Sequence, residues 1–345
     1  MFRSKTLFIL GAGSSQEVGL PVGNQLKEII AKNIKIEFAD GYHQSSGSTH
    51  ITNALNQISS QRNGGFPNIN PYLEKLCTLI NALPLAISID NLLDAHKEDE
   101  KISVCGKLGI VSSILEAERK SSLFFNVYKN NCFNIGQSNN TWFSELLKLL
   151  TENVSKSEIS NIFTNVDFIN FNYDRCLEHY LFHTIQTYYN LSRIEIFNVI
   201  NKLKVFRPYG VVGKLDWQDN NLQSVPYGSD NADLSNLYRG IKTFNEQIHD
   251  ESVISSIKKL IEEAETIVFL GFAYHRQNTE LLRIVERSQV KRILGTAFGL
   301  SNSDCIEIKN ELISTFALHR SSLIELKQDL KCKDLLIQYG RTLTA

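Results

Sequence analysis

The chain has 345 residues, of which 42% are hydrophobic, so it can fill the core of one large domain or two medium ones. Its 36 Lys and Arg nearly balance its 37 Asp and Glu, so no global field draws it to nucleic acid or to an acidic membrane. Its apolar runs are much shorter than the roughly 20 residues that span a bilayer. We therefore expect a soluble, cytoplasmic protein with no membrane segment and no direct nucleic-acid partner.

The chain opens with a buried strand that runs directly into glycines. Thr6–Leu10 is apolar and is followed by Gly11 and Gly13, and a helix is predicted to begin near Val22. Glycines leave no Cβ between the backbone and a pyrophosphate, and the N–H groups at a helix start favour an anion. The segment predicts a nucleotide site. Gln16 replaces the third glycine of GxGxxG and no Gly-Lys-Ser/Thr follows, so neither the dehydrogenase nor the ATPase loop is met.

Residues 33–160 do not alternate strands with helices and are predicted to form a mainly helical insertion. The polar stretch 41–71 predicts an exposed loop. Apolar residues at helical spacing predict three helices, at Leu73–Leu83, Ile102–Tyr128 and Trp142–Val154.

Strand signals return at Val166 and continue through the second half of the chain. Four segments predict strands: Val166–Ile169, Lys204–Phe206, Thr266–Leu270 and Arg292–Leu294. With the first strand they predict an α/β fold, a Rossmann-like parallel sheet flanked by helices, built from residues 1–32 and 161–345. The carboxyl ends of parallel strands share one edge, so the residues that follow them should converge with the glycine loop.

Polar residues follow several of these strands. Asn172 can hold a water or a ribose hydroxyl, and Asp174 can stabilise a developing cation, although Asp174 can also serve only to cap the next helix. Further on, Arg207 can contact phosphate or pair with a surface acid, and Tyr209 can stack on a ring or bond a ribose.

Two later strand ends are predicted to border the nucleotide. Gly271 permits close approach of a ligand, and Asn278 or Thr279 is expected to cap the following helix, with His275 in the loop between them. Gly295 and Thr296 are placed to border a nucleoside.

Two other patterns point elsewhere. His179 and His183 are spaced as in a zinc helix but lack the Glu of HExxH, so a solvated surface pair is expected. Ile34–Asp40 alternates like a strand and ends in acids about 20 residues beyond the glycine loop, as in a dehydrogenase. Glu37 and Asp40 therefore keep a nicotinamide-dependent oxidoreductase open as an alternative.

Cysteine usage argues against a metal site. The six cysteines are Cys77, Cys105, Cys132, Cys176, Cys305 and Cys332. No two of them form a CxxC pair, so we expect reduced, mostly buried thiols, no zinc ribbon and no metal.

Several of these motifs together resemble the sirtuin-like superfamily. The motifs are Gly11-Ala-Gly-Ser-Ser15 with Gly19 and Pro21, Asn172-Tyr-Asp174 and Gly271-Phe-Ala273. They occur in the order that the superfamily uses. The chain is most similar to the bacterial sirtuin-like domains of antiphage defence systems, in which Ser88-Ile-Asp90 followed by Leu92-Leu93 also resembles a frequent motif.

The resemblance implies a site for NAD, with Asn172 and Asp174 at the nicotinamide ribose. The residues expected to bind NAD are Gly11, Ala12, Gly13, Ser14, Ser15, Pro21, Gly271, Phe272, Gly295 and Thr296. The residues expected to take part in catalysis are Asn172, Asp174, Arg207 and Tyr209. Protein deacylation is the superfamily's familiar reaction, but many defence members hydrolyse NAD to nicotinamide and ADP-ribose, and the missing zinc ribbon favours that branch.

One residue departs from the superfamily pattern. Tyr209 stands where histidine is expected, and a phenol with a pKa of about 10 is a poor base near neutral pH. Either activity is weak, or another group such as His96 or His275 substitutes, or catalysis is lost and the chain only binds a nucleotide. The leading hypothesis is an NAD hydrolase that acts as an effector of antiphage defence, as a homo-oligomer with a partner such as a motor ATPase or a phage-sensing subunit. The main alternative is a sensor that binds NAD or ADP-ribose.

Overall fold

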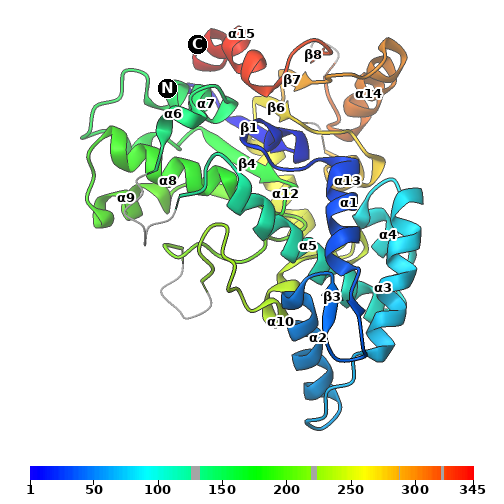
Figure 1. Cartoon of the computed structure of the whole chain (residues 1–345). Helices are drawn as coiled ribbons and strands as arrows, with labels where there is room; N and C mark the ends of the chain where they lie inside the picture. Colours follow the sequence, from blue (N-terminus) through cyan, green and yellow to red (C-terminus); the bar gives the residue numbers. More distant parts are fainter. Residues whose placement is uncertain (126–132, 219–223, 287, 320–321) are drawn as a thin grey trace.

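The computed structural model describes residues 1–125, 133–218, 224–286, 288–319 and 322–345, and a six-stranded sheet forms its centre (Figure 1). All five strand pairings in the sheet are parallel. The strands are β1 (Thr6–Leu10), β4 (Val166–Asn170), β5 (Lys204–Phe206), β6 (Thr266–Leu270), β7 (Arg292–Thr296) and β8 (Leu323–Lys327). Their order across the sheet is β5-β4-β1-β6-β7-β8.

This strand order is the doubly wound Rossmann order. Counted along the chain, the six strands lie as 3-2-1-4-5-6, so the direction of winding reverses between β1 and β6. The predicted α/β class with a parallel, helix-flanked sheet is therefore confirmed. In such sheets ligands bind in the crevice at the carboxyl ends of the strands, at the point of reversal.

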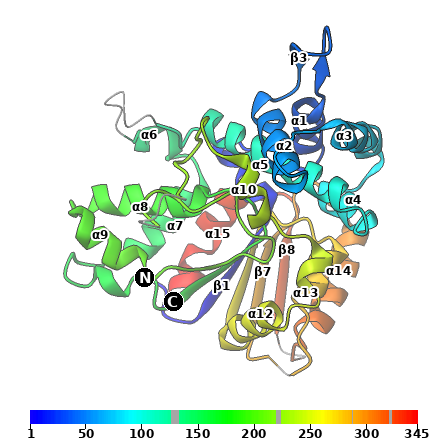
Figure 2. The same cartoon turned by 90° about the horizontal axis from the view of Figure 1, so that it is seen from below.

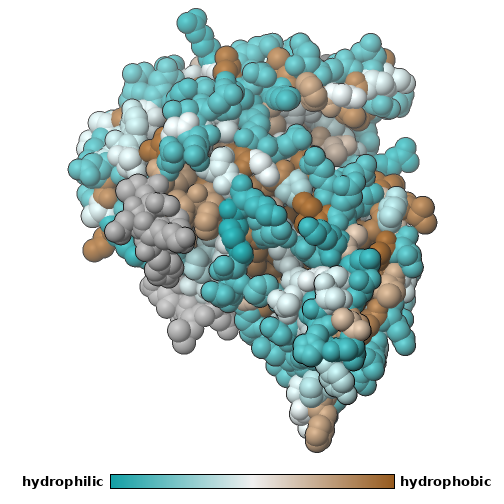
Figure 3. Space-filling view, viewed as in Figure 1, coloured by the Kyte–Doolittle hydropathy of each residue, from teal (hydrophilic) through white to brown (hydrophobic). Residues whose placement is uncertain are grey.

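Helices cover both faces of the sheet because successive side chains of each strand point to opposite sides. In β1, Leu7 and Ile9 join one apolar core, and Phe8 and Leu10 join the other. Against Phe8 and Leu10 lie α7 (Trp142–Thr151), α8 (Cys176–Tyr188), α9 (Arg193–Ile200) and α15 (Cys332–Thr344). Against Leu7 and Ile9 lie α12 (Glu251–Glu263), α13 (Arg276–Leu281) and α14 (Asn302–Thr315). The surface seen in Figure 3 is largely hydrophilic, with apolar residues dispersed over it.

A second group of helices packs beside the sheet and extends away from it (Figure 2). This helical layer consists of α1 (Gly23–Ile34), α2 (Thr49–Arg62), α3 (Asn70–Ala82), α4 (Ile89–Ala95) and α5 (Glu100–Lys120). Three short helices complete the described part, namely α6 (Ile135–Ser138), α10 (Leu234–Leu237) and α11 (Phe244–Gln247). The helical layer shares one apolar cluster with the sheet, in which Ile30, Leu55 and Leu108 join Leu7 and Ile9. No helix among the described residues is long and apolar enough to cross a membrane.

Several predicted elements differ from the observed ones. The polar stretch 41–71 contains α2, because Ile51, Leu55 and Ile58 supply a buried stripe beneath its polar residues. The edge strand β8 was not predicted. The helix predicted at Ile102–Tyr128 ends at Lys120, and residues 126–128 lie outside the described part.

The segment expected to serve a dehydrogenase does not belong to the parallel sheet. Its only strand residues, Glu37–Phe38, form β2 and pair antiparallel with β3 (Gln44–Ser46) in a separate hairpin. The Asp40 carboxylate accepts hydrogen bonds from the backbone of Tyr42 and His43. The prediction of a Rossmann strand at Ile34–Asp40, on which the oxidoreductase alternative depends, is therefore wrong.

Candidate functional site

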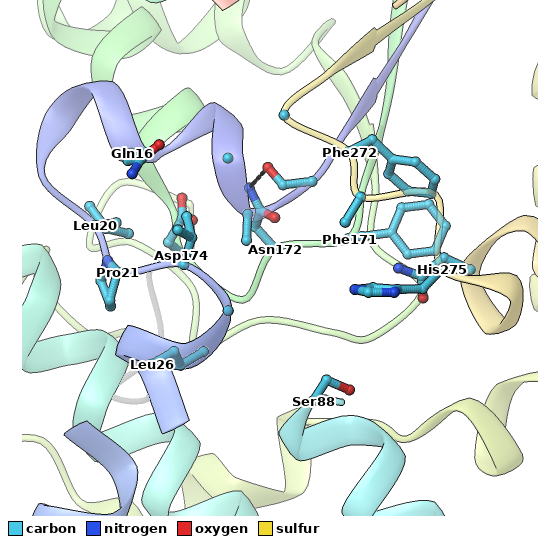
Figure 4. Close-up of a pocket in the computed structure, with 18 of the residues that line it drawn as sticks. Gln16, Leu20, Pro21, Leu26, Ser88, Phe171, Asn172, Asp174, Phe272 and His275 are labelled. Carbon is cyan, nitrogen blue, oxygen red and sulfur yellow. Dashed lines mark hydrogen bonds between the residues drawn. The ribbon is translucent and has the colours of Figure 1, made fainter. Parts of the chain in front are cut away.

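A cavity of about 660 Å³ lies at the carboxyl edge of the sheet, where the winding reverses (Figure 4). The loops that follow β1, β4, β6 and β7 form one wall. The start of α1, the start of α4 and Ile114 of α5 form the other. Segments from both ends and the middle of the chain thus meet around one space, as the strand-end argument predicts.

Most of the residues predicted for the site line this cavity. They are Gly11, Ala12, Gly13, Pro21, Asn172, Asp174, Tyr209, Gly271, Phe272 and Thr296. Four predicted residues do not line it, namely Ser14, Ser15, Arg207 and Gly295. Gly295 is buried behind the wall, where an added Cβ would lie 2.3 Å from the Tyr274 hydroxyl.

The glycine turn that follows β1 packs directly against the glycine turn that follows β6. The Gly13 N–H donates to the Gly271 carbonyl at 2.9 Å, and the Gly11 N–H donates to Leu270 at 3.0 Å. A Cβ on Gly11 or Gly13 would lie 2.6 or 2.9 Å from Gly271, and Gly271 itself has a φ of +59°. These glycines are therefore required for the contact between the turns, and the room that they leave for a pyrophosphate stays a prediction.

The turn after β1 does not lead straight into a helix. Two short 3₁₀ turns, Ala12–Ser14 and Gln16–Val18, come first, and α1 begins at Gly23. The helix start near Val22 is confirmed, and Val22 and Gly23 line the cavity opposite the strand ends.

Asn172 presents its amide oxygen to the cavity. Its amide nitrogen donates to the Gly11 carbonyl at 3.0 Å and to the hydroxyls of Ser14 and Ser15 at 3.2 and 3.3 Å. No described residue donates to its Oδ1, and Asn172 lines the cavity. The nitrogen is thus used to hold the glycine turn, while the oxygen remains available to a water or a hydroxyl.

Asp174 both caps the start of α8 and lines the cavity. Its carboxylate accepts the Cys176 N–H at 3.0 Å at the start of α8, and it also lines the cavity. Burial raises the pKa of this carboxyl, while the positive charge of Arg207 opposes the rise.

Arg207 supports the site from behind instead of entering it. Its guanidinium forms hydrogen bonds of 2.7 to 3.1 Å with the Glu178 carboxylate and donates to the Asn172 carbonyl at 2.6 Å. Of the two roles predicted for Arg207, contact with phosphate or pairing with a surface acid, the structure shows pairing with an acid. That acid, Glu178, is buried and does not lie at the surface. Arg207 fixes the backbone that carries Asn172.

Tyr209 lies in the cavity wall as a hydrogen-bond donor. Its hydroxyl donates to Asn278 Oδ1 at 2.7 Å. Burial raises the pKa of Tyr209 well above its usual value, so the phenol keeps its proton near neutral pH. It does not supply the base that histidine would.

Two residues from the other wall and rim belong to the site as well. Asp90 of α4 lines the cavity, accepts a hydrogen bond from the Tyr173 hydroxyl, and has its pKa raised by burial to about 6. The Ser88-Ile-Asp90 motif is its only signal in the sequence. His275 also lines the cavity, whereas His96 does not. The prediction that Asn278 or Thr279 caps the next helix is wrong, because His275 is the residue at the N-cap of α13 and both predicted residues lie inside the helix.

The histidines of α8 are not a solvated surface pair. His179 is buried, its ring stacks on Tyr227 with centroids 4.0 Å apart, and its Nε2 is 3.1 Å from the Leu123 carbonyl. His183 is half-buried and packs against Phe182. The expectation was wrong because the loop around Tyr227, distant in sequence, covers this face of the helix.

No protein-family model matches the chain, and no curated protein matches it.

Proposed function

We propose that the chain hydrolyses NAD to nicotinamide and ADP-ribose. One observation carries the proposal: a single cavity at the reversal point of a Rossmann-ordered sheet brings together the glycine turn and the free amide oxygen of Asn172. The first feature suits a nucleotide, and the second suits the placement of a water beside it.

The arrangement of the strand ends suits an extended dinucleotide. β4 and β7 lie three strand spacings apart, which is about 14 Å. NAD laid along the edge would have its nicotinamide ribose near Asn172 and Asp174 and its adenosine near Thr296. The two acids Asp90 and Asp174 are at the end that would receive the cationic nicotinamide ring.

The proposed reaction needs little acid catalysis. The bond from ribose C1′ to nicotinamide breaks with its electrons going to the ring nitrogen, so the leaving group departs neutral through an oxocarbenium-like state. Asn172 Oδ1 accepts a hydrogen bond from the attacking water, and Asp174 binds the ribose or stabilises its developing positive charge.

The test is nicotinamide release from NAD by the full chain and by Asn172→Ala, quantified by chromatography. We expect the variant to lose at least about 100-fold in rate, because a positioned group of this kind typically contributes 10² or more. The matched control is Asn165→Ala, which precedes β4 at the opposite edge of the sheet and whose amide donates to the carbonyls of Phe2 and Arg3. Equal rates in wild type and Asn172→Ala would contradict the role of Asn172.

The alternative is a sensor that binds NAD or ADP-ribose without cleaving it. It is favoured by Tyr209, whose hydroxyl is engaged with Asn278 and whose pKa is raised. Calorimetric titration that detects NAD binding, together with no nicotinamide release, would favour the sensor. The antiphage role, the cytoplasmic homo-oligomer and a defence partner such as a motor ATPase or phage-sensing subunit are proposed from the sirtuin-like resemblance alone.

A further inference from the structure

The proposed hydrolysis leaves one proton without an acceptor. Water that attacks ribose C1′ must lose a proton, and an amide such as Asn172 orients water without accepting that proton. Tyr209 remains protonated and donates to Asn278. The carboxylates Asp90 and Asp174 also line the cavity, but the proposed position of NAD assigns them to the cationic ring and the ribose. We therefore look for the base among the other residues of the cavity.

His275 is the histidine that the fold brings to this place. Among the described residues it is the only histidine that lines the cavity, and Figure 4 shows its imidazole pointing into it. Its ring forms no hydrogen bond or ion pair with any described residue. His275 is exposed at the cavity rim, and partial desolvation there lowers the pKa of its ring below the ordinary value. The ring is therefore neutral near pH 7 and can accept a proton.

The position of His275 is fixed through Tyr209. The His275 carbonyl accepts the N–H groups of Asn278 and Thr279 at 2.9 and 3.1 Å, which closes the first turn of α13. Tyr209 then holds Asn278 by its side chain. On the far side of the turn, the Thr279 hydroxyl donates to Glu311 at 2.6 Å. The tyrosine that stands in place of the family's histidine thus anchors the turn that carries another histidine.

We propose that His275 is the catalytic base of the hydrolysis, a role that rests on the proposed function. The C1′–nicotinamide bond breaks and its electron pair leaves with the ring nitrogen. The oxygen of water forms the new bond to C1′, and one proton of that water passes to the unprotonated nitrogen of His275 and then to solvent. The products are nicotinamide, ADP-ribose and one proton.

The charged surroundings of His275 set the pH range of the test. The titratable groups that line the same cavity are Glu17, Lys27, Asp90, Tyr173, Asp174, Tyr209, Lys331 and Cys332. The elements packed against α13 add Asp94 of α4, Glu246 of α11 and Glu311 of α14. Asp90, whose pKa is about 6, titrates in the same range, so the pH profile must also be recorded in Asp90→Asn.

The experiment compares kcat and KM for NAD in wild type, His275→Ala and His275→Gln, from pH 5 to 8, with and without added imidazole. We expect kcat to fall by about 100-fold in both variants, with KM changed less than about twofold, because a general base typically contributes 10² to 10⁴. We also expect the acidic limb of the wild-type kcat profile to disappear, and imidazole to restore part of the rate in His275→Ala. The matched control is His249→Ala, because His249 is exposed like His275 but does not line the cavity.

The outcomes separate this role from the proposed function. No nicotinamide release from the wild type would overturn the hydrolase and the base together. Release that is lost in Asn172→Ala but unchanged in His275→Ala would overturn only the base. A lower rate caused by a raised KM, without rescue by imidazole, would also overturn it, because His275 would then bind substrate only.

Discussion

Gly271 shows how much a single residue can decide at this site. Its φ of +59° turns the chain after β6, and a Cβ at this position would lie 2.0 Å from Ser14 N and 2.2 Å from the Gly13 carbonyl carbon. The Gly271 N–H also donates to the Thr296 hydroxyl oxygen Oγ1 at 2.8 Å. The sequence marks Gly11, Gly13 and Gly271 as exceptional, but it does not show that they touch, because that contact joins residues more than 250 positions apart.

Gly271→Ala should therefore lower the free energy of unfolding far more than a substitution that causes backbone strain without a clash. We expect a loss of about 4 kcal/mol or more in the free energy of unfolding, measured by urea denaturation, since a core clash adds to the strain. Gly64→Ala is the matched control, with a φ of +65° and no atom within 4 Å of the added Cβ, and it should lose only about 1 kcal/mol. Similar losses in the two variants would show that the turns tolerate the clash.

At the scale of elements, α4 joins the helical layer to both sides of the cavity. Asp90 accepts a hydrogen bond from Tyr173, which lies between Asn172 and Asp174 in the chain. One turn further along α4, Asp94 accepts the Gln277 amide at 3.1 Å, next to the Asn278 that Tyr209 holds. A shift of α4 would therefore move the Asn172 and His275 sides of the site together.

The raised pKa of Asp90 makes this connection dependent on pH. A folded-state pKa of about 6, against an unfolded value of 3.8, means that the folded protein binds more protons between these values. The stabilisation that this carboxyl contributes is fully present below about pH 4 and is lost as pH rises through 6. Asp90→Asn keeps an acceptor for Tyr173 without the charge. At pH 7 it should therefore exceed the wild type in stability by on the order of 2 kcal/mol.

Urea unfolding at pH 4 and pH 7 measures this difference. We expect the advantage of Asp90→Asn at pH 7 to shrink toward zero at pH 4, while the exposed Asp329→Asn stays parallel to the wild type at both pH values. An advantage that is equal at the two pH values would mean that the substitution acts through packing and not through ionisation.

The sequence predicts the elements well where burial is complete and poorly where it is partial. β1, β4 and β6 are fully buried strands in the middle of the sheet, and the predicted bounds of each agree with the observed ones within one residue. β8, at the edge, is only half-buried, so its apolar residues alternate weakly with Glu325 and Lys327. The same logic predicts the site residues at the strand ends. It does not choose between His275 and His96 or give Asp90 a place in the site, because these positions depend on how helices from elsewhere pack.

Taken whole, the molecule holds its cavity between two bodies of structure that share one apolar core. Strand-end loops form one wall, and α1, α4 and α5 form the other. A bound dinucleotide would contact both walls and should order both of them at once.

Hydrogen exchange measured with and without ADP-ribose tests this arrangement. We expect slower exchange in three segments that are far apart in the sequence, namely residues 11–16, 88–92 and 271–278, because all three border the cavity. The remote helix α9 should be unaffected and serves as the internal control. Protection confined to one segment would place the ligand outside the cavity.

Because the residues that line the cavity are distributed along nearly the whole chain, the cavity can form only late in synthesis. Its lining runs from Gly11 to Cys332, and the first glycine turn has nothing to fit against until Gly271 has been made. A nascent chain on the ribosome, or a fragment cut short before β6, therefore carries the first glycine turn without the cavity. The NAD hydrolysis proposed above would accordingly start only when the polypeptide is nearly complete.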